Sequence, residues 1–136
     1  MSEELRDLLR DVGLLVLRIG IGTLMIVGHG YPKWANFAEV AAKFHDPLGV
    51  GAEMSLWLVI FAELFCSVLV ILGLATRFAA IPVVFAMCVA AFVVNAGEPL
   101  SSKELAIVYA VPFLTLVFTG PGRISLDAVI GFLRRE

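Results

Sequence analysis

The chain has 136 residues, of which 60% are hydrophobic and 16% are charged, and its mean hydropathy is +0.97. Soluble domains average about 45–50% apolar and about 25% charged residues, so this composition excludes a soluble core and indicates an integral membrane protein in one compact unit. The formal net charge of −2 gives no reason to expect nucleic acid as a partner. The lipid bilayer is therefore the expected environment of the chain.

The N-terminal segment MSEELRDLLRD has alternating charges and no small-residue cleavage site, so no signal peptide is expected. Ser2 can cap a helix with acidic residues in its first turn, and the spacing of the leucines predicts a short amphipathic helix over 2–11 at the membrane surface. This helix leads into the first predicted span, residues 12–30, which is long enough to cross the bilayer. Pro32 is expected to stop the helix.

The first predicted span contains small residues and one charge. Gly13, Gly20 and Gly22 are expected to let a neighbouring helix approach closely. Arg18 lies about 9 Å inside the span at 1.5 Å per residue. Its side chain either extends to the lipid headgroups or forms a structural ion pair inside the bundle. In the second case its partner is expected to be Asp127, or else the free carbonyls at the end of the second span.

The second predicted span, residues 54–75, carries a single charge, Glu63, well inside an otherwise apolar run. A carboxylate at that depth is costly and is a functional-site hypothesis by default. The preceding residues, 36–46, have apolar positions on one helical face and predict a surface helix. Cys66 and Cys88 lie in the second and third spans. They are either two small buried hydrophobic residues or a pair that cycles through a disulfide.

A very short turn predicts that the third span, residues 78–95, runs antiparallel to the second. The fourth predicted span covers residues 100–119, where Ser101 and Glu104 fit a capping box. The last apolar stretch, residues 124–135, is too short to span and predicts a surface helix. The expected fold class is all-α integral membrane: a four-transmembrane-helix bundle with short amphipathic surface helices.

The distribution of lysine and arginine predicts the orientation of the bundle. The side that holds both termini has Arg6, Arg10, Arg77, Arg123, Arg134 and Arg135, and the other side has Lys33, Lys43 and Lys103. Both termini are therefore expected to be cytoplasmic. Helical side chains lean toward the N-terminus of their helix, so polar groups of all four spans would meet in the outer half of the bilayer. They are His29, Lys33, Glu63, Asn95, Glu104 and Tyr109. Two of these residues have a purely structural alternative. His29 could be a histidine at a helix end that bonds the backbone or water, and Glu104 could belong to the capping box with Ser101.

Several short motifs, in this order and spacing, resemble the DoxX family of small bacterial membrane proteins. They are Leu17-Arg18, His29-Gly30 with Lys33, Ala62-Glu63, Gly73 with Thr76-Arg77, Glu104, Gly120-Pro121-Gly122-Arg123 and Ser125-Leu126-Asp127. The resemblance covers nearly the whole chain and implies a single four-helix domain in the bacterial cytoplasmic (inner) membrane. It also implies redox chemistry, since relatives include a subunit of thiosulfate:quinone oxidoreductase. Relatives often carry a histidine where this chain has Asn95, so a titratable group is missing there.

The resemblance implies a quinone-linked redox role, with Glu63 and His29 as catalytic candidates and Lys33, Asn95, Glu104 and Tyr109 as ligand-binding residues. Glu63 would carry a proton to the quinone headgroup. No haem, flavin, iron–sulfur or metal motif occurs, so electrons would come from a partner oxidoreductase subunit or a direct substrate. Two alternatives are a non-catalytic membrane subunit or anchor and a small-molecule or lipid carrier. A further expected partner is a second copy of the chain, in a homo-oligomer.

Overall fold

The computed structural model describes residues 1–136 and consists of helices joined by turns, with no strand. Four helical segments are long and apolar enough to cross a membrane: Glu3–Ala35, Ala52–Leu72, Thr76–Val94 and Leu100–Thr119. The prediction of an all-α membrane protein with four spans is confirmed.

The first span consists of α1 (Glu3–Met25), a π-helical turn (Ile26–Gly30) and α2 (Tyr31–Ala35). Because α1 is continuous from Glu3, the helix predicted over 2–11 is not a separate element. Pro32 does not stop the helix, contrary to expectation. It stands in the first turn of α2, directly after the wider π-helical turn, where its missing N–H and its ring are tolerated.

The second span consists of α4 (Ala52–Ile60), a π-helical turn (Phe61–Cys66) and α5 (Ser67–Leu72). The third span consists of α6 (Thr76–Val89) and a further π-helical turn (Ala90–Val94). Three of the four spans therefore depart from regular α-helical geometry within their apolar part.

The fourth span is the single helix α7 (Leu100–Thr119). Its N-cap is Pro99, in an extended conformation and without a side-chain hydrogen bond, so the capping box predicted from Ser101 and Glu104 is wrong. Both residues lie inside the helix, because α7 begins at Leu100. Two short helices lie outside the four spans: α3 (Phe37–Lys43) and α8 (Leu126–Leu133).

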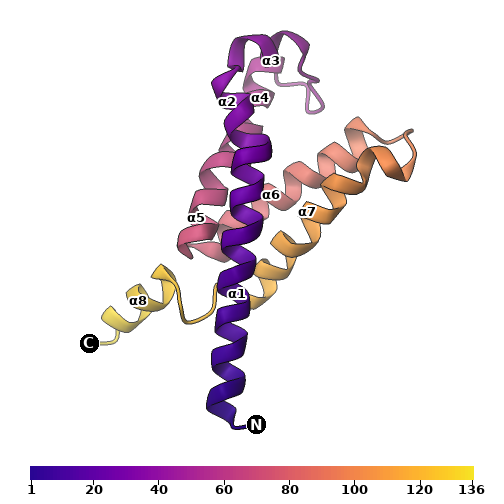
Figure 1. The fold of residues 1–136 in the computed structure, drawn as a ribbon. Coiled ribbons are helices and arrows are strands. Elements are labelled where there is room, and N and C mark those ends of the chain that lie inside the picture. The colour runs from indigo at the N-terminus through magenta and orange to yellow at the C-terminus, as the bar shows by residue number, and fades with distance from the viewer.

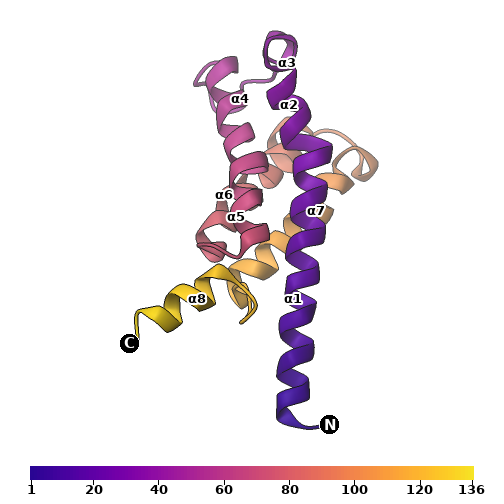
Figure 2. The same ribbon diagram turned by 60° about the vertical axis from the view of Figure 1, so that its left-hand side comes forward.

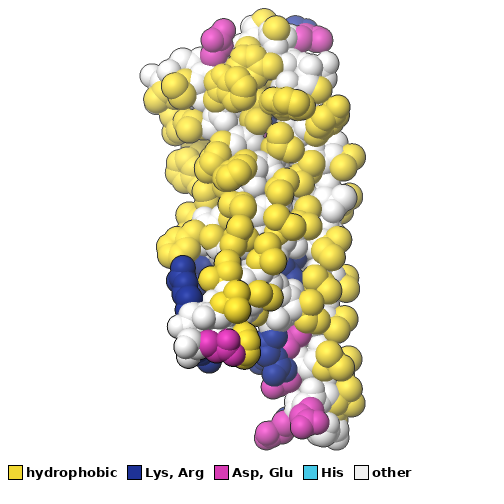
Figure 3. Space-filling model, turned by 90° about the vertical axis from the view of Figure 1, so that its left-hand side faces the viewer, with side chains coloured by type: hydrophobic (Ala, Val, Ile, Leu, Met, Phe, Trp, Pro, Cys, Tyr) yellow, Lys and Arg dark blue, Asp and Glu magenta, His cyan; other side chains and the backbone are white.

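The helices form an elongated bundle in which α6 packs along α7 and α1 packs along α5 (Figures 1 and 2). Both termini lie toward the same end of the bundle, and α2 and α3 lie at the opposite end. The first turns of α1 project beyond the other helices. Hydrophobic side chains cover the middle of the face in Figure 3, and charged side chains gather toward its two ends. This distribution suits a molecule surrounded by lipid at mid-height.

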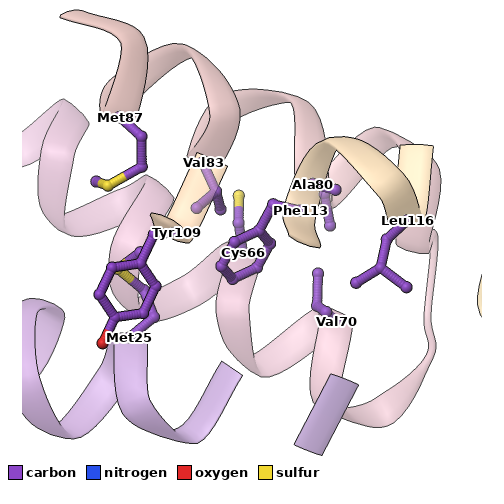
Figure 4. Close-up of a cluster of buried hydrophobic side chains, with 10 residues drawn as sticks. Met25, Cys66, Val70, Ala80, Val83, Met87, Tyr109, Phe113 and Leu116 are labelled. Atoms are coloured by element: carbon purple, nitrogen blue, oxygen red, sulfur yellow. The ribbon is translucent and has the colours of Figure 1, made fainter. Parts of the chain in front are cut away.

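A cluster of buried side chains joins all four spans (Figure 4). It consists of Met25, Cys66, Val70, Ala79, Ala80, Val83, Met87, Tyr109, Phe113 and Leu116. Cys66 is buried in this cluster, Cys88 is half-buried, and both are free thiols. The cluster fixes α6 and α7 against α5 and thereby sets the position of Tyr109.

Arg18 is only 1% exposed, yet it does not form the predicted ion pair with Asp127. Its guanidinium donates hydrogen bonds to the carbonyl of Ile71, at 3.4 Å, and to that of Ile124. The expected alternative, a carbonyl at the end of the second span, is therefore one of the two observed partners, and the carbonyl of Ile124 before α8 is the other. The physical reason is that Asp127 is used elsewhere. Its carboxylate accepts hydrogen bonds from the backbone N–H groups of Ala75 and Thr76, at 2.7 and 3.1 Å, where α6 begins.

Candidate functional site

The three π-helical turns surround one region between the spans. π-Helical turns are rare and are frequently found at functional sites, because the widened turn changes where side chains point. The turn at Ile26–Gly30 contains His29, and the turn at Phe61–Cys66 contains Glu63. The turn at Ala90–Val94 contributes apolar lining to the same cavity. Irregular backbone from three helices thus converges on the two residues that sequence analysis selected as catalytic candidates.

The cavity has a volume of about 300 Å³, at the lower end of the range of about 300–1,000 Å³ that is usual for ligand pockets. Four of the six residues expected to meet in a polar site line it: His29, Lys33, Glu63 and Tyr109. The rest of the lining is mostly apolar. The cavity is large enough for a small ring-shaped group with polar substituents.

The shortest polar contact at the cavity is the ion pair between Lys33 and Glu63, with 2.7 Å between Nζ and Oε2. The Glu63 side chain is 4% exposed and the Lys33 side chain is 23% exposed. Lys33 Nζ also donates to the carbonyl of His29 at 3.4 Å, one helical turn back along the same span. An ammonium has three N–H donors, so one remains for a group in the cavity.

Gly30 allows the close approach that makes this ion pair. A Cβ atom at Gly30 would lie 2.8 Å from both the carbonyl carbon of Glu63 and the amide nitrogen of Leu64. Only glycine therefore lets the backbone of the first span rest on that of the second at this level. Sequence analysis used Gly30 only as part of a family motif and did not identify this contact.

The glycines that were expected to mediate helix packing behave differently from one another. Gly22 packs closely, since its Cβ would lie 2.6 Å from Ile71 Cγ1. No atom lies within 4 Å of a Cβ at Gly13 or Gly20, so these two do not mediate contact within the chain. The spacing of small residues alone did not show which side of the first span faces the second.

His29 and Tyr109 meet edge to face, with ring centroids 5.1 Å apart and an interplanar angle of 81°. Figure 4 shows Tyr109 at the same end of the buried cluster as Met25 and Met87. Neither the His29 ring nor the Tyr109 hydroxyl forms a hydrogen bond with another residue of the chain, although both side chains line the cavity. Both groups are thus free to bond a ligand there.

Asn95 and Glu104 do not line the cavity. The Asn95 side chain instead donates a hydrogen bond to the carbonyl of Ala90 at 2.8 Å, across the end of the third π-helical turn. Glu104 is exposed, and it lies about 160° around α7 from Ser102, which does line the cavity. No group of three or more His, Cys, Asp or Glu side chains that could hold a metal ion occurs in the structure.

The segment between α3 and α4 contributes lining that sequence analysis missed, namely Phe44, His45 and Pro47. No periodic pattern marks such residues, because they lie in a loop. Asp46 fixes this loop by accepting hydrogen bonds from Ser55 Oγ at 2.7 Å and Gly51 N at 2.7 Å. These bonds, that from Ser55 first, lower the pKa of the Asp46 carboxyl.

A lowered pKa links the stability of this loop to pH. The stabilising contribution of Asp46 is fully present above the ordinary aspartate value of about 4 and is lost as the pH falls through the lower value of the folded state. The loop over the cavity therefore keeps its hydrogen bonds throughout the neutral range.

Together the fold and this site define a small membrane protein of four helical spans with an ion pair between the first and second spans, in which the carboxylate is buried and the ammonium is partly exposed. The chain belongs to the DoxX family, whose model matches residues 13–96. The matched region includes both Lys33 and Glu63. A protein of Haemophilus influenzae, described as uncharacterized, is 29% identical over 127 residues, which cover 88% of this chain and 83% of that protein. No solved structure matches the chain.

Proposed function

We propose that the chain has a quinone-linked redox role and that the cavity beside Lys33 and Glu63 binds the quinone headgroup. The observation that carries this proposal is the ion pair of 2.7 Å at the wall of a cavity of about 300 Å³, within the spans. Ionisable groups at membrane depth are costly and normally mark a functional pathway. The redox context comes from the resemblance to the DoxX family, whose relatives include a subunit of thiosulfate:quinone oxidoreductase.

The donors at the cavity fit a quinone headgroup, whose two carbonyl oxygens accept hydrogen bonds. The third N–H of Lys33, the hydroxyl of Tyr109 and an N–H of the His29 ring are the donors available for them. Reduction of a bound quinone to the quinol takes up two electrons and two protons, one proton at each oxygen. Glu63 takes one proton from water at the mouth of the cavity and delivers it to the oxygen beside Lys33. The Tyr109 hydroxyl gives the second proton to the other oxygen and is reprotonated from water. His29 orients Tyr109 through their edge-to-face contact.

The electrons come from a partner oxidoreductase subunit or from a direct reductant, of which thiosulfate is the first candidate. We expect the purified protein in lipid nanodiscs to reduce a quinone with such a reductant. Glu63→Gln is expected to lower the rate by about 100-fold or more, because general acid–base groups contribute about 10²–10⁴-fold. Glu104→Gln, a matched change at an exposed position, should leave the rate unchanged.

Three results separate this proposal from its alternatives. No turnover above that of Glu63→Gln in the wild type would remove the redox role for the isolated chain. Activity that appears only with a copurifying enzyme would instead favour a non-catalytic subunit. A bound small molecule or lipid that undergoes no redox change would favour a carrier.

We further propose that both termini face the cytoplasm of a bacterium and that the chain lies in its inner membrane. The arginines at the end of the bundle that holds the termini support this orientation. At the other end, Lys43 and Lys103 are the lysines outside the cavity. The cavity would then lie in the outer half of the bilayer. A C-terminal alkaline phosphatase fusion is expected to be inactive, and an active fusion would contradict this orientation.

A further inference from the structure

A second cavity, of about 230 Å³, lies between α4 and α6. Its walls are almost entirely apolar, and they include Leu58, Phe61, Pro82 and Phe85. Its one polar side chain is Ser55, whose hydroxyl already donates a hydrogen bond to Asp46 at 2.7 Å. This groove therefore offers no free side-chain polar group and suits a hydrocarbon.

The groove adjoins the polar cavity. Pro47, Val59, Ala86 and Val89 line both spaces, so the two share a wall built from α4, α6 and the loop before α4. Ala86 presents only a methyl group at this wall. A molecule that passes this wall at Ala86 would have its polar head beside Glu63 and its apolar chain in the groove.

The groove is also open toward the lipid side of the bundle. Leu58, Phe61 and Phe85 are all exposed on the surface of the second and third spans. These spans carry no charged side chain at this level other than Glu63, which points into the bundle. The rim of the groove is thus the kind of surface that acyl chains cover, and an apolar chain can enter it from within the bilayer.

We propose that this groove binds the first isoprenoid units of a quinone tail, so that the substrate class is a long-tailed, lipid-soluble quinone that enters from the bilayer between α4 and α6. This inference rests on the proposed quinone-linked function of the adjoining cavity. It assigns the head to the cavity of Lys33 and Glu63 and the tail to the groove of Leu58 and Phe85. A water-soluble substrate would use the cavity and leave the groove to lipid.

The test compares two quinones with the same headgroup, one with an isoprenoid tail and one without a tail. Leu58→Trp and Phe85→Trp narrow the groove at exposed positions, where the fold tolerates bulk. We expect each to raise the KM for the tailed quinone about tenfold over the wild type and to leave the KM for the tailless quinone unchanged. Ile81→Trp is the control, because it adds the same ring to α6 at an exposed position outside both cavities.

A second measurement does not depend on turnover. A tailed quinone with a diazirine on its first isoprenoid unit should crosslink to groove residues of the wild type and less to Leu58→Trp. If both groove variants turn over both quinones with unchanged kinetics, the quinone tail does not bind in the groove, and the redox role is unaffected. Crosslinks in the groove without any turnover would support binding of the quinone tail in the groove and would contradict the redox role. Absence of both signals would overturn both.

Discussion

Alanine at Gly30 is expected to lower the free energy of unfolding by about 2–3 kcal/mol and to separate Lys33 from Glu63. The added Cβ would lie 2.8 Å from the carbonyl carbon of Glu63 and 2.9 Å from its oxygen. These are backbone atoms of the second span, which cannot rotate away as a side chain can. The first span must therefore move outward, and the ion pair moves with it.

Gly28→Ala is the matched control, because Gly28 lies in the same π-helical turn and no atom lies within 4 Å of its Cβ position. Thermal unfolding can be followed through Cys66, which is 2% exposed and becomes reactive to a thiol-directed fluorophore on unfolding. The measurement requires a Cys88→Ala background, since Cys88 is only half-buried. If Gly30→Ala unfolded at the same temperature as Gly28→Ala, the two backbones would not be in contact.

The four spans could be predicted because length and apolar composition determine them almost alone. Part of the site could be predicted because helical side chains lean toward the N-terminus. This rule draws His29 on the first span and Glu63 on the antiparallel second span toward the same depth. Lys33 lies one turn beyond His29 and therefore follows it to the cavity.

The predictions of site residues were wrong where the depth of a residue in the membrane does not tell which face of the helix its side chain occupies. Glu104 and Tyr109 are five residues apart in α7, which is about 140° around the helix, so they cannot share a cavity wall. Asn95 is directed to a backbone carbonyl of the π-helical turn before it. No sequence rule marks such turns. The π-helical turn before Pro32 also explains why the helix continues through this proline. Arg18 and Asp127 were paired because both were expected in the inner half of the bundle, but they bond different backbone groups.

Removal of Lys33 alone is expected to destabilise the protein by about 3 kcal/mol, because breaking a buried ion pair from one side leaves an uncompensated charge. In Lys33→Met the Glu63 side chain, 4% exposed, loses its only hydrogen-bond partner. Glu63→Gln should cost less, because the Lys33 side chain is 23% exposed and can turn its ammonium toward the cavity. Lys43→Met removes a lysine from exposed α3 and is expected to have no effect.

The double variant Lys33→Met/Glu63→Gln should recover much of the lost stability, since it leaves no unpaired charge in the spans. A double-mutant cycle on unfolding is expected to give a coupling energy of about 2 kcal/mol. Because the double variant is stable, its activity can be measured without the effect of unfolding. If the pair only holds the bundle together, the refolded double variant keeps any activity or partner binding of the wild type. If Glu63 carries protons and Lys33 holds the quinone oxygen, the double variant folds well and stays as inactive as Glu63→Gln.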